Sequence, residues 1–594
     1  MRLHHLSGPV LRSLNSVTEH EDAVTFLLDT EVSRRLLLLR MILDAGAEVP
    51  HGDASELTRA WQLLESAERA DPASFRRALL EPQVGVWAAT LVRRLSRPDP
   101  QAAAGEAPLR VELGFLAQLA AAVFVTAGVD FYARVPLWDG QVILPGLGRA
   151  TVRGEGWSTA EVSARDGVVR VAAGGTTTTL PQDVESDAPG WEGLRKLRAE
   201  HAGVAVTVTL DDLGPGAPVP ALRRAGRLSP ARFVRWQDWF GRMWPELVEG
   251  HPDSARALAA GLLSVVPLAR GERLRARAAS SSDAFGCVLL SEPDADDDVL
   301  PAQLGVALVH ELRHSLLNGL AFLTPLFEER GELFHTPWRD DPRPIGGLVH
   351  GAYAFSGVAH YWRTRGTDGL AGFEFALWRD AVRAVLETLL DHPALTPSGS
   401  ALVTALYEQT SGWREDQVSP REQRLAHLAA THHQATWRVH HLHTPTAHAR
   451  ELTAAWCEGR RGVRGGTEPE LRVDPHARRL DSLALLARLS LVAPAEFEAL
   501  RQVDDPAHLL PGVARADVAL MDGDAETAVK LYAEELTGPG GRQAAWAGLG
   551  LALAERGEAA AGAALVEHPE LAVAVSRSLP TPPDPVALAH WLAG

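Results

Sequence analysis

The stretch Val309-His310-Glu311-Leu312-Arg313-His314-Ser315-Leu316-Leu317-Asn318 decides how the middle of the chain folds. Apolar residues recur through and around it at helical spacing and no proline interrupts it, so it predicts a buried helix. Two histidines four residues apart lie on one face of a helix, where both imidazoles can bind one metal ion. The stretch therefore predicts a helix that carries two metal ligands, His310 and His314.

Glu311 directly follows the first of these histidines, near the open side of such a metal. In that position a carboxylate can act as a general base or accept a hydrogen bond beside the metal. The alternative is a surface helix with two incidental histidines. The apolar flanks argue against it, because they bury the helix and buried imidazoles need partners.

Composition narrows the classes of function. The 594 residues contain 58 Lys and Arg against 75 Asp and Glu, a net charge of −17, which argues against a primary role on nucleic acid or an anionic membrane. Two cysteines cannot form a disulfide scaffold or a cysteine-rich zinc site. Without a recognisable secretion signal or membrane span, we expect a cytoplasmic protein.

A chain of this length is too long for one hydrophobic core. Its changes of hydrophobic period predict an α+β protein that is mainly helical. Helices are expected at 32–43, 54–70 and 111–127, and a strand at 285–290. We expect four regions: a helical N-terminal region (1–130), a small β-rich module (131–215), a helical metal-binding core (216–470) and a helical C-terminal region (475–594).

The C-terminal region contains an internal sequence similarity. Gly523 and Gly557 are 34 residues apart in similar surroundings, which is the period of a tetratricopeptide repeat. With two units visible, a plain bundle of helical hairpins is the alternative. The region is therefore expected to be TPR-like, and such stacks usually hold partners or pack on a catalytic domain.

A second distinctive stretch runs from Thr336 to Arg363. Pro342 and Pro344 predict an extended segment, and a helix rich in small residues is expected to start near Ile345. The small residues would let this helix approach another one closely. Two arginines precede it and could hold an anion through paired hydrogen bonds; the alternative is that they pair with the adjacent aspartates. The residues concerned are Arg339, Arg343, Asp340 and Asp341.

These motifs together resemble the HExxH-type α-ketoglutarate-dependent peptide β-hydroxylases, which occur beside radical-SAM maturases of ribosomally made, modified peptides. The residues that carry the resemblance are Val309–Asn318, the loop Pro337–Pro344 and the block Gly347–Phe355, with Ser282–Gly286 ahead of them. The resemblance implies a non-heme Fe(II) enzyme that uses α-ketoglutarate and O₂ to hydroxylate a β-carbon of a precursor peptide. A maturase is a possible partner enzyme.

Carried over by position, His310 and His314 would bind iron and His350 would be the third ligand. A third histidine departs from the usual two-histidine, one-carboxylate triad, so a glutamate at 328, 329 or 332 is the alternative. His335 and His360 are not expected to bind the metal. Arg343, or else Arg339, would hold the distal carboxylate of α-ketoglutarate, with Tyr353 on the same helix face as His350.

Two other classes of protein remain open. In a zinc metallopeptidase, Glu311 would activate a zinc-bound water. In a non-enzymatic helical scaffold, the metal would be vestigial or structural. The arginines and the proline-rich loop favour the oxygenase, and no sequence rule excludes the peptidase.

Overall fold

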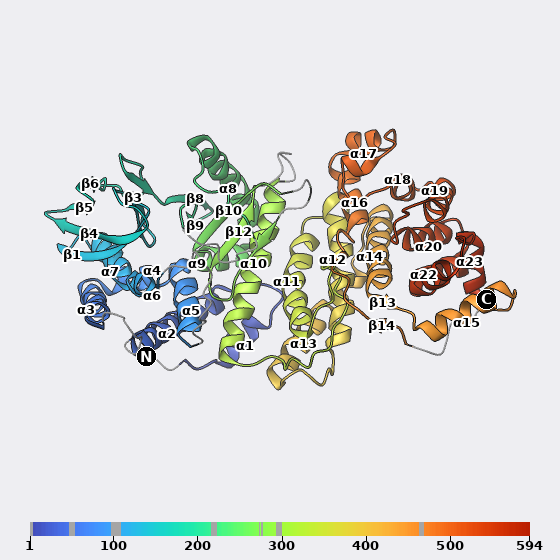
Figure 1. Cartoon of the computed structure of the whole chain (residues 1–594), viewed down its shortest axis with the longest axis horizontal. Coiled ribbons are helices and arrows are strands. Elements are labelled where there is room, and N and C mark those ends of the chain that lie inside the picture. Colours follow the sequence, from blue (N-terminus) through green and yellow to red (C-terminus); the bar gives the residue numbers. More distant parts are fainter. Residues whose placement is uncertain are drawn as a thin grey trace. The chain divides into compact units, whose positions relative to one another are not determined.

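The computed structural model describes residues 4–46, 54–96, 108–214, 222–271, 274, 277–292, 300–461 and 468–594 (Figure 1). The chain divides into two units, Met1–Thr324 and Pro325–Gly594, and each is described by itself. Helices predominate and strands are also present, so the mainly helical α+β class is confirmed. The division falls inside the range 216–470 that the sequence analysis treats as one core.

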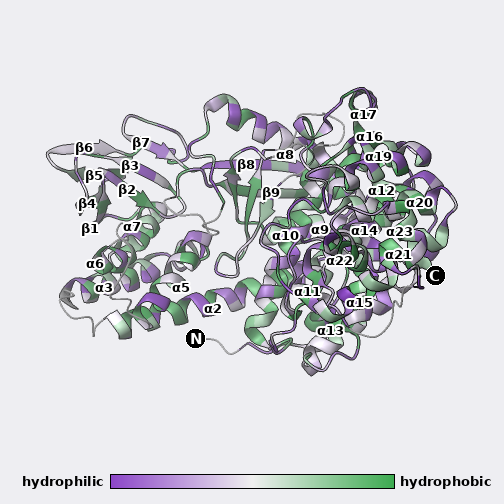
Figure 2. Ribbon diagram, turned by 45° about the vertical axis from the view of Figure 1, so that its right-hand side comes forward, coloured by the Kyte–Doolittle hydropathy of each residue, from purple (hydrophilic) through white to green (hydrophobic). Residues whose placement is uncertain are grey.

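The N-terminal region is helical. The predicted helix 54–70 is α3 (Ala54–Ala70), and the helix expected at 32–43 lies within α2 (Glu21–Gly46), along which hydrophobic and hydrophilic residues alternate (Figure 2). The helix expected at 111–127 is broken at Gly114, where a Cβ would lie 2.5 Å from the ring of Pro136. The remaining helices here are α1 (Gly8–Leu14), α4 (Pro72–Leu79), α5 (Pro82–Ser96), α6 (Leu109–Leu113) and α7 (Phe115–Ala127).

A seven-stranded antiparallel sheet follows, in the strand order β6-β5-β4-β1-β2-β3-β7. Residues of β1 alternate between buried and exposed, and its buried face packs against α7 (Figure 1). Because α7 is buried along most of its length, it forms the core beneath the sheet. The strands are β1 (Phe131–Trp138), β2 (Gln141–Leu144), β3 (Gly148–Thr151), β4 (Trp157–Arg165), β5 (Val168–Ala173), β6 (Thr176–Thr179) and β7 (Trp191–Gly193).

A second sheet of five strands has the order β11-β12-β10-β9-β8. The strands of the expected β-rich module of 131–215 therefore belong to two sheets, because β8 pairs with β9 and β9 pairs with β10 from beyond residue 260. Strand β10 was not expected, and the strand predicted at 285–290 is β12, shifted by one to two residues. The strands are β8 (Arg195–His201), β9 (Val204–Leu210), β10 (Ser264–Leu268), β11 (Ala278–Ala279) and β12 (Cys287–Ser291).

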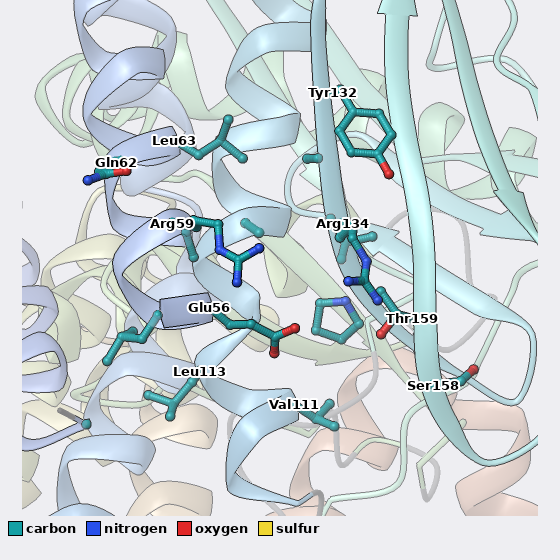
Figure 3. A pocket seen from close by; sticks show the side chains of 18 of the residues that line it. Glu56, Arg59, Gln62, Leu63, Val111, Leu113, Tyr132, Arg134, Ser158 and Thr159 are labelled. Carbon is teal, nitrogen blue, oxygen red and sulfur yellow. The ribbon is translucent and has the colours of Figure 1, made fainter. Parts of the chain in front are cut away.

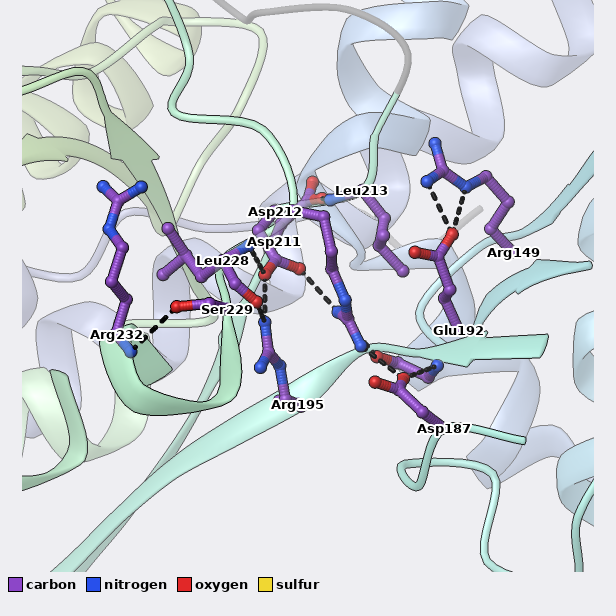
Figure 4. Close-up of polar contacts among 12 residues, drawn as sticks. Arg149, Asp187, Glu192, Arg195, Asp211, Asp212, Leu213, Leu228, Ser229 and Arg232 are labelled. Atoms are coloured by element: carbon purple, nitrogen blue, oxygen red, sulfur yellow. Dashed lines mark hydrogen bonds and ion pairs between the residues drawn. The ribbon is translucent and has the colours of Figure 1, made fainter. Parts of the chain in front are cut away.

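A buried carboxylate ties this sheet to the helices that follow it. The side chain of Asp212 is fully buried and accepts hydrogen bonds from Arg195, from Arg227 and from the backbone N–H of Leu228 (Figure 4). Arg227 also pairs with Asp187. Since a buried carboxylate is stable only when it is paired and hydrogen-bonded, this network fixes the segment that leads into α8 (Pro230–Gly250) and α9 (Pro252–Gly261).

The second unit is built from helical hairpins. Helix α11 packs against α12, α12 against α14, and the later helices pair in succession. The buried carboxylate of Asp517 binds the hydroxyl of Tyr532 and the guanidinium of Arg542. The helices are α11 (Ile345–Arg363), α12 (Gly369–Leu389), α13 (Pro397–Thr410), α14 (Pro420–His441), α15 (Thr446–Cys457), α16 (Ser482–Val492), α17 (Pro494–Leu500), α18 (Arg515–Asp522), α19 (Ala525–Thr537), α20 (Ala545–Glu555), α21 (Ala559–Glu567), α22 (Pro569–Ser578) and α23 (Pro585–Ala593).

Two short strands in the described part of this unit, β13 (Leu442–His443) and β14 (Glu470–Leu471), pair with each other. Across the described residues, no helix is long and apolar enough to cross a bilayer.

Candidate metal-binding site

The predicted motif helix is α10 (Leu300–Leu323). The leucines around the motif are buried as the sequence predicted, with Leu308, Leu312 and Leu316 at most 2% exposed. His310 and His314 lie one turn apart, and their Nε2 atoms are 3.1 Å from each other. The two imidazoles therefore point at the same place.

This arrangement fits two ligands of one ion. Nitrogens each about 2.1 Å from a common ion and 3.1 Å from each other would subtend about 95° at it. Burial, with a smaller effect from the charge of Arg313, lowers the pKa of His310 to about 4. The ring is therefore neutral at physiological pH, and neutral imidazole is the form that binds metals.

Glu311 lies inside the unit beside these histidines. It is 3% exposed, and burial raises the pKa of its carboxyl to about 7, against the opposing effect of a hydrogen bond from Ser280. Its Oε2 atom is buried and has no hydrogen-bond partner among the described residues. A buried polar atom of this kind is commonly satisfied by a water or a bound group, which fits a position beside a metal.

Arg313 has a structural role that the sequence analysis missed. Its guanidinium is fully buried and pairs at 3.0 Å with Glu19, which is itself 2% exposed. It also donates to the backbone oxygen of Ser16 at 3.1 Å, and Ser254 of α9 donates to Glu19. An arginine inside an apolar helix was the available signal, since a buried guanidinium needs a partner.

The second unit holds the remaining predicted residues. Helix α11 begins at Ile345 as expected, behind Pro344. His350 is partly buried, which lowers the pKa of its imidazole, and Tyr353 is 1% exposed. His310 and His314 belong to the first unit, so the assignment of His350 as third ligand stays a prediction.

The small residues of α11 accommodate side chains of the preceding loop. A Cβ at Gly351 would lie 2.1 Å from the indole of Trp338, and one at Gly347 would lie 2.8 Å from Cβ of Arg343. Trp338 in turn stacks on Phe355, with ring centroids 4.8 Å apart. Within this unit, these two glycines make room for the loop rather than for a neighbouring helix.

Both predicted anion-binding arginines share one carboxylate. Arg339 contacts Asp341 at 2.9 Å and Arg343 contacts it at 3.1 Å, and these hydrogen bonds lower the pKa of the Asp341 carboxyl despite partial burial. Pairing of these arginines with the adjacent aspartates was the alternative in the sequence analysis, and the structure has this pairing for Asp341. Asp340 instead accepts hydrogen bonds from the backbone N–H groups of Arg479 and Leu480.

His335, which was not expected to bind the metal, and two of the alternative glutamates, Glu328 and Glu332, have other contacts. His335 Nε2 lies 3.2 Å from Nδ1 of His433 on α14, and burial keeps the pKa of His335 well below its usual value. Glu328 lies 3.5 Å from Arg330, and Glu332 lies 3.5 Å from His392. In the parts of the chain that the structure describes, no group of three or more His, Cys, Asp or Glu residues is arranged to hold a metal.

Comparison with known proteins does not identify a family. No protein-family model matches the sequence, and a search of curated proteins finds no significant relative. What the geometry provides is a converging pair of imidazoles with a buried carboxyl beside them.

We expect Arg313→Met to destabilise the protein by about 3 kcal/mol or more, because it leaves the carboxylate of Glu19 buried without its cation. Chemical denaturation followed by circular dichroism measures this loss. Arg40→Met is the matched control, since Arg40 pairs with Asp44 on the surface and should show no measurable change. Equal stability of Arg313→Met and the wild-type protein would contradict the role of the ion pair.

Proposed function

We propose that this chain is a non-heme Fe(II), α-ketoglutarate-dependent oxygenase that hydroxylates a β-carbon in a ribosomally synthesised precursor peptide. The observation that carries the proposal is the 3.1 Å separation of the His310 and His314 Nε2 atoms on a buried helix. The two histidines and the Pro337–Pro344 loop also belong to the sequence motifs that resemble the peptide hydroxylases. The proposal includes a cytoplasmic site of action and a possible partner maturase.

Each residue of the proposed site would have its own role. His310, His314 and His350 would hold the iron, which when bound supplies the chemistry that activates O₂. Arg343, or else Arg339, would bind the distal carboxylate of α-ketoglutarate in a bidentate contact, and Tyr353 would line the same site. Glu311 would stay beside the metal as a hydrogen-bonding group.

Asp341 gives the proposed anion site a specific property. Its carboxylate already contacts both arginines, so it holds the guanidinium groups in place before any cosubstrate arrives. A cosubstrate carboxylate would have to displace it from Arg343. Because Asp341 and both arginines are 39 to 55% exposed, this exchange would take place near solvent, where ion pairs are weak.

The second candidate is a zinc metallopeptidase. The observation that favours it is the buried carboxyl of Glu311, whose pKa of about 7 suits a general base near neutral pH. In that case Glu311 would accept a proton from a zinc-bound water. The two candidates share the histidine ligands and differ in what Glu311 must do.

We also propose that the C-terminal hairpins form a TPR-like stack that supports binding of a partner. Gly523 and Gly557 end α18 and α20 with φ values of 90° and 97°, which closes two successive hairpins. Gly562 packs against Gly550, since a Cβ at Gly562 would lie 2.6 Å from the Gly550 oxygen. Such close helix contacts are what small residues at a hairpin crossing permit.

We predict that His310→Ala and His314→Ala each abolish metal binding while leaving the fold intact, because a site that loses one of three protein ligands is too weak. Metal analysis and circular dichroism of the purified variants test this. His427→Ala, an exposed histidine on α14, is the control and should retain the metal. Full metal occupancy in both ligand variants would refute the site.

Glu311→Gln separates the two candidate functions. An oxygenase should lose only part of its activity, because no water has to be deprotonated, whereas a peptidase should keep its metal and lose nearly all activity. The assay is mass spectrometry of a candidate peptide incubated with enzyme, Fe(II), α-ketoglutarate and ascorbate. Gain of one oxygen atom supports the oxygenase, and hydrolytic fragments support the peptidase.

Arg343→Lys tests the cosubstrate site. A lysine cannot make the bidentate contact, so the KM for α-ketoglutarate should rise more than the KM for the peptide. Asp341→Asn should have the opposite effect on the KM for α-ketoglutarate, because it removes the competing carboxylate. Equal changes in both KM values for Arg343→Lys would point to a different anchoring residue.

A further inference from the structure

Strand β1 has one open edge. On one side it pairs with β4 along its whole length, from Phe131 to Trp138. On the other side it pairs with β2 only through Trp138 and Gln141. Among the described residues, no strand pairs with this side of β1 before Trp138.

The turn between β1 and β2 determines which backbone groups face the open side. Asp139 and Gly140 have φ values of 42° and 77°, as in a two-residue hairpin turn. The flanking Trp138 and Gln141 then exchange hydrogen bonds, so every second residue before Trp138 points its N–H and C=O toward the same side. These residues are Tyr132, Arg134 and Pro136.

A side-chain contact agrees with this orientation. Gln118 of α7 donates a hydrogen bond to the backbone oxygen of Pro136 at 3.3 Å. Pro136 has no N–H to offer, so the groups left for a further strand are the N–H and C=O of Tyr132 and of Arg134. Two residues of this kind can form up to four backbone hydrogen bonds with an added antiparallel strand.

A groove of about 570 Å³ runs along this edge, within the usual size range of a binding site. Figure 3 shows Tyr132 and Arg134 on the strand side, with Glu56, Arg59 and Gln62 of α3 opposite them. All five residues from Tyr132 to Pro136 line the groove. At about 3.4 Å per residue, this wall matches about five residues of an extended peptide.

The two faces of β1 indicate what side chains such a peptide would carry. Arg134 lies on the exposed face of β1, directly opposite Glu161 of β4. A peptide residue placed opposite Arg134 on the open side would interact with it most favourably if it were acidic. Arg59 adds a second positive charge to the groove, against one negative charge from Glu56. The peptide residues before and after this acidic residue would point toward the apolar floor of the groove, which includes Leu57, Ala60, Leu113 and Ala117.

We propose that this groove binds an extended peptide segment with alternating acidic and apolar residues, which adds to β1 as an antiparallel strand. The binding site follows from the strand edge and the groove alone. The inference rests on the proposed function only in taking the occupant to be a recognition segment of the peptide substrate. Strand addition of this kind supplies affinity through the backbone and specificity through alternate side chains.

Binding of defined peptides to the full chain tests the proposal. The probe is a labelled, acetylated decapeptide of alternating Val and Glu, compared with one of alternating Val and Lys by fluorescence anisotropy. The Glu peptide should bind, and the Lys peptide should bind more weakly. Arg59→Glu and Arg134→Glu should each weaken binding of the Glu peptide by about fivefold, whereas Arg170→Glu, on the exposed face of β5 outside the groove, should not.

N-methylation shows whether the peptide adds as a strand. Opposite Arg134, the amide of a Glu residue faces β1, so methylating the Glu amides should abolish binding, whereas methylating the Val amides should not. Hydrogen exchange provides a second measurement. In the free chain the amides of Tyr132 and Arg134 should exchange faster than those of Ala133 and Val135, and the bound Glu peptide should protect them.

Three results would overturn the proposal. They are equal binding of the Glu and Lys peptides, binding that is insensitive to Arg59→Glu and Arg134→Glu, and absence of protection at Tyr132 and Arg134. A concentration-dependent dimer that is lost in Arg134→Glu would instead assign the edge to a second copy of the chain. None of these measurements uses catalysis, so their failure is distinct from failure of the proposed oxygenase activity.

Discussion

The buried ion pair between Arg313 and Glu19 fixes the orientation of the helix that carries His310 and His314. Arg313 lies about 100° around the helix from His314, so holding its guanidinium determines which way the imidazoles point. The partners come from the segment before α2 and, through Ser254, from α9. Because both charges are almost fully buried, either one left alone would carry a large desolvation penalty. The geometry of the histidine pair therefore depends on residues almost 300 positions earlier in the chain.

The second unit arranges its charged loop by a similar principle, closer to solvent. Trp338 packs over Gly351, and Arg343 packs over Gly347, so the Pro337–Pro344 loop lies on the first turns of α11. Asp341 then holds Arg339 and Arg343 together, and Asp340 binds the backbone at Arg479 and Leu480. The loop is ordered by packing and by internal charge pairs before any ligand is considered.

Local features of the sequence were sufficient to predict the main helices. The bounds of α3 and the start of α11 behind Pro344 follow from periodicity and from the fixed φ of proline, which act within a few residues. The burial of α10 and the closeness of the His310 and His314 ring nitrogens follow from the same local spacing. These were the predictions that the structure confirms.

Features that depend on distant partners could not be predicted in this way. The parallel pairing of β9 with β10 joins segments more than 50 residues apart, and strand alternation alone does not say which strands will pair. The partner of Arg313 could not be predicted either, because the sequence near residue 313 does not indicate Glu19. Assigning a third metal ligand needs the same kind of long-range information, which is why His350 remains a proposal.

The composition of the β1 edge also has a consequence for solubility. Exposed strand edges promote aggregation, because two copies can join through their unpaired backbone groups. If two copies of β1 met antiparallel about Arg134, that arginine would face its own counterpart, and like charges directly opposite each other repel. Pro136 would face Tyr132 without an N–H to donate. An edge built in this way resists polymerisation of the chain with itself and remains open to a strand of opposite charge.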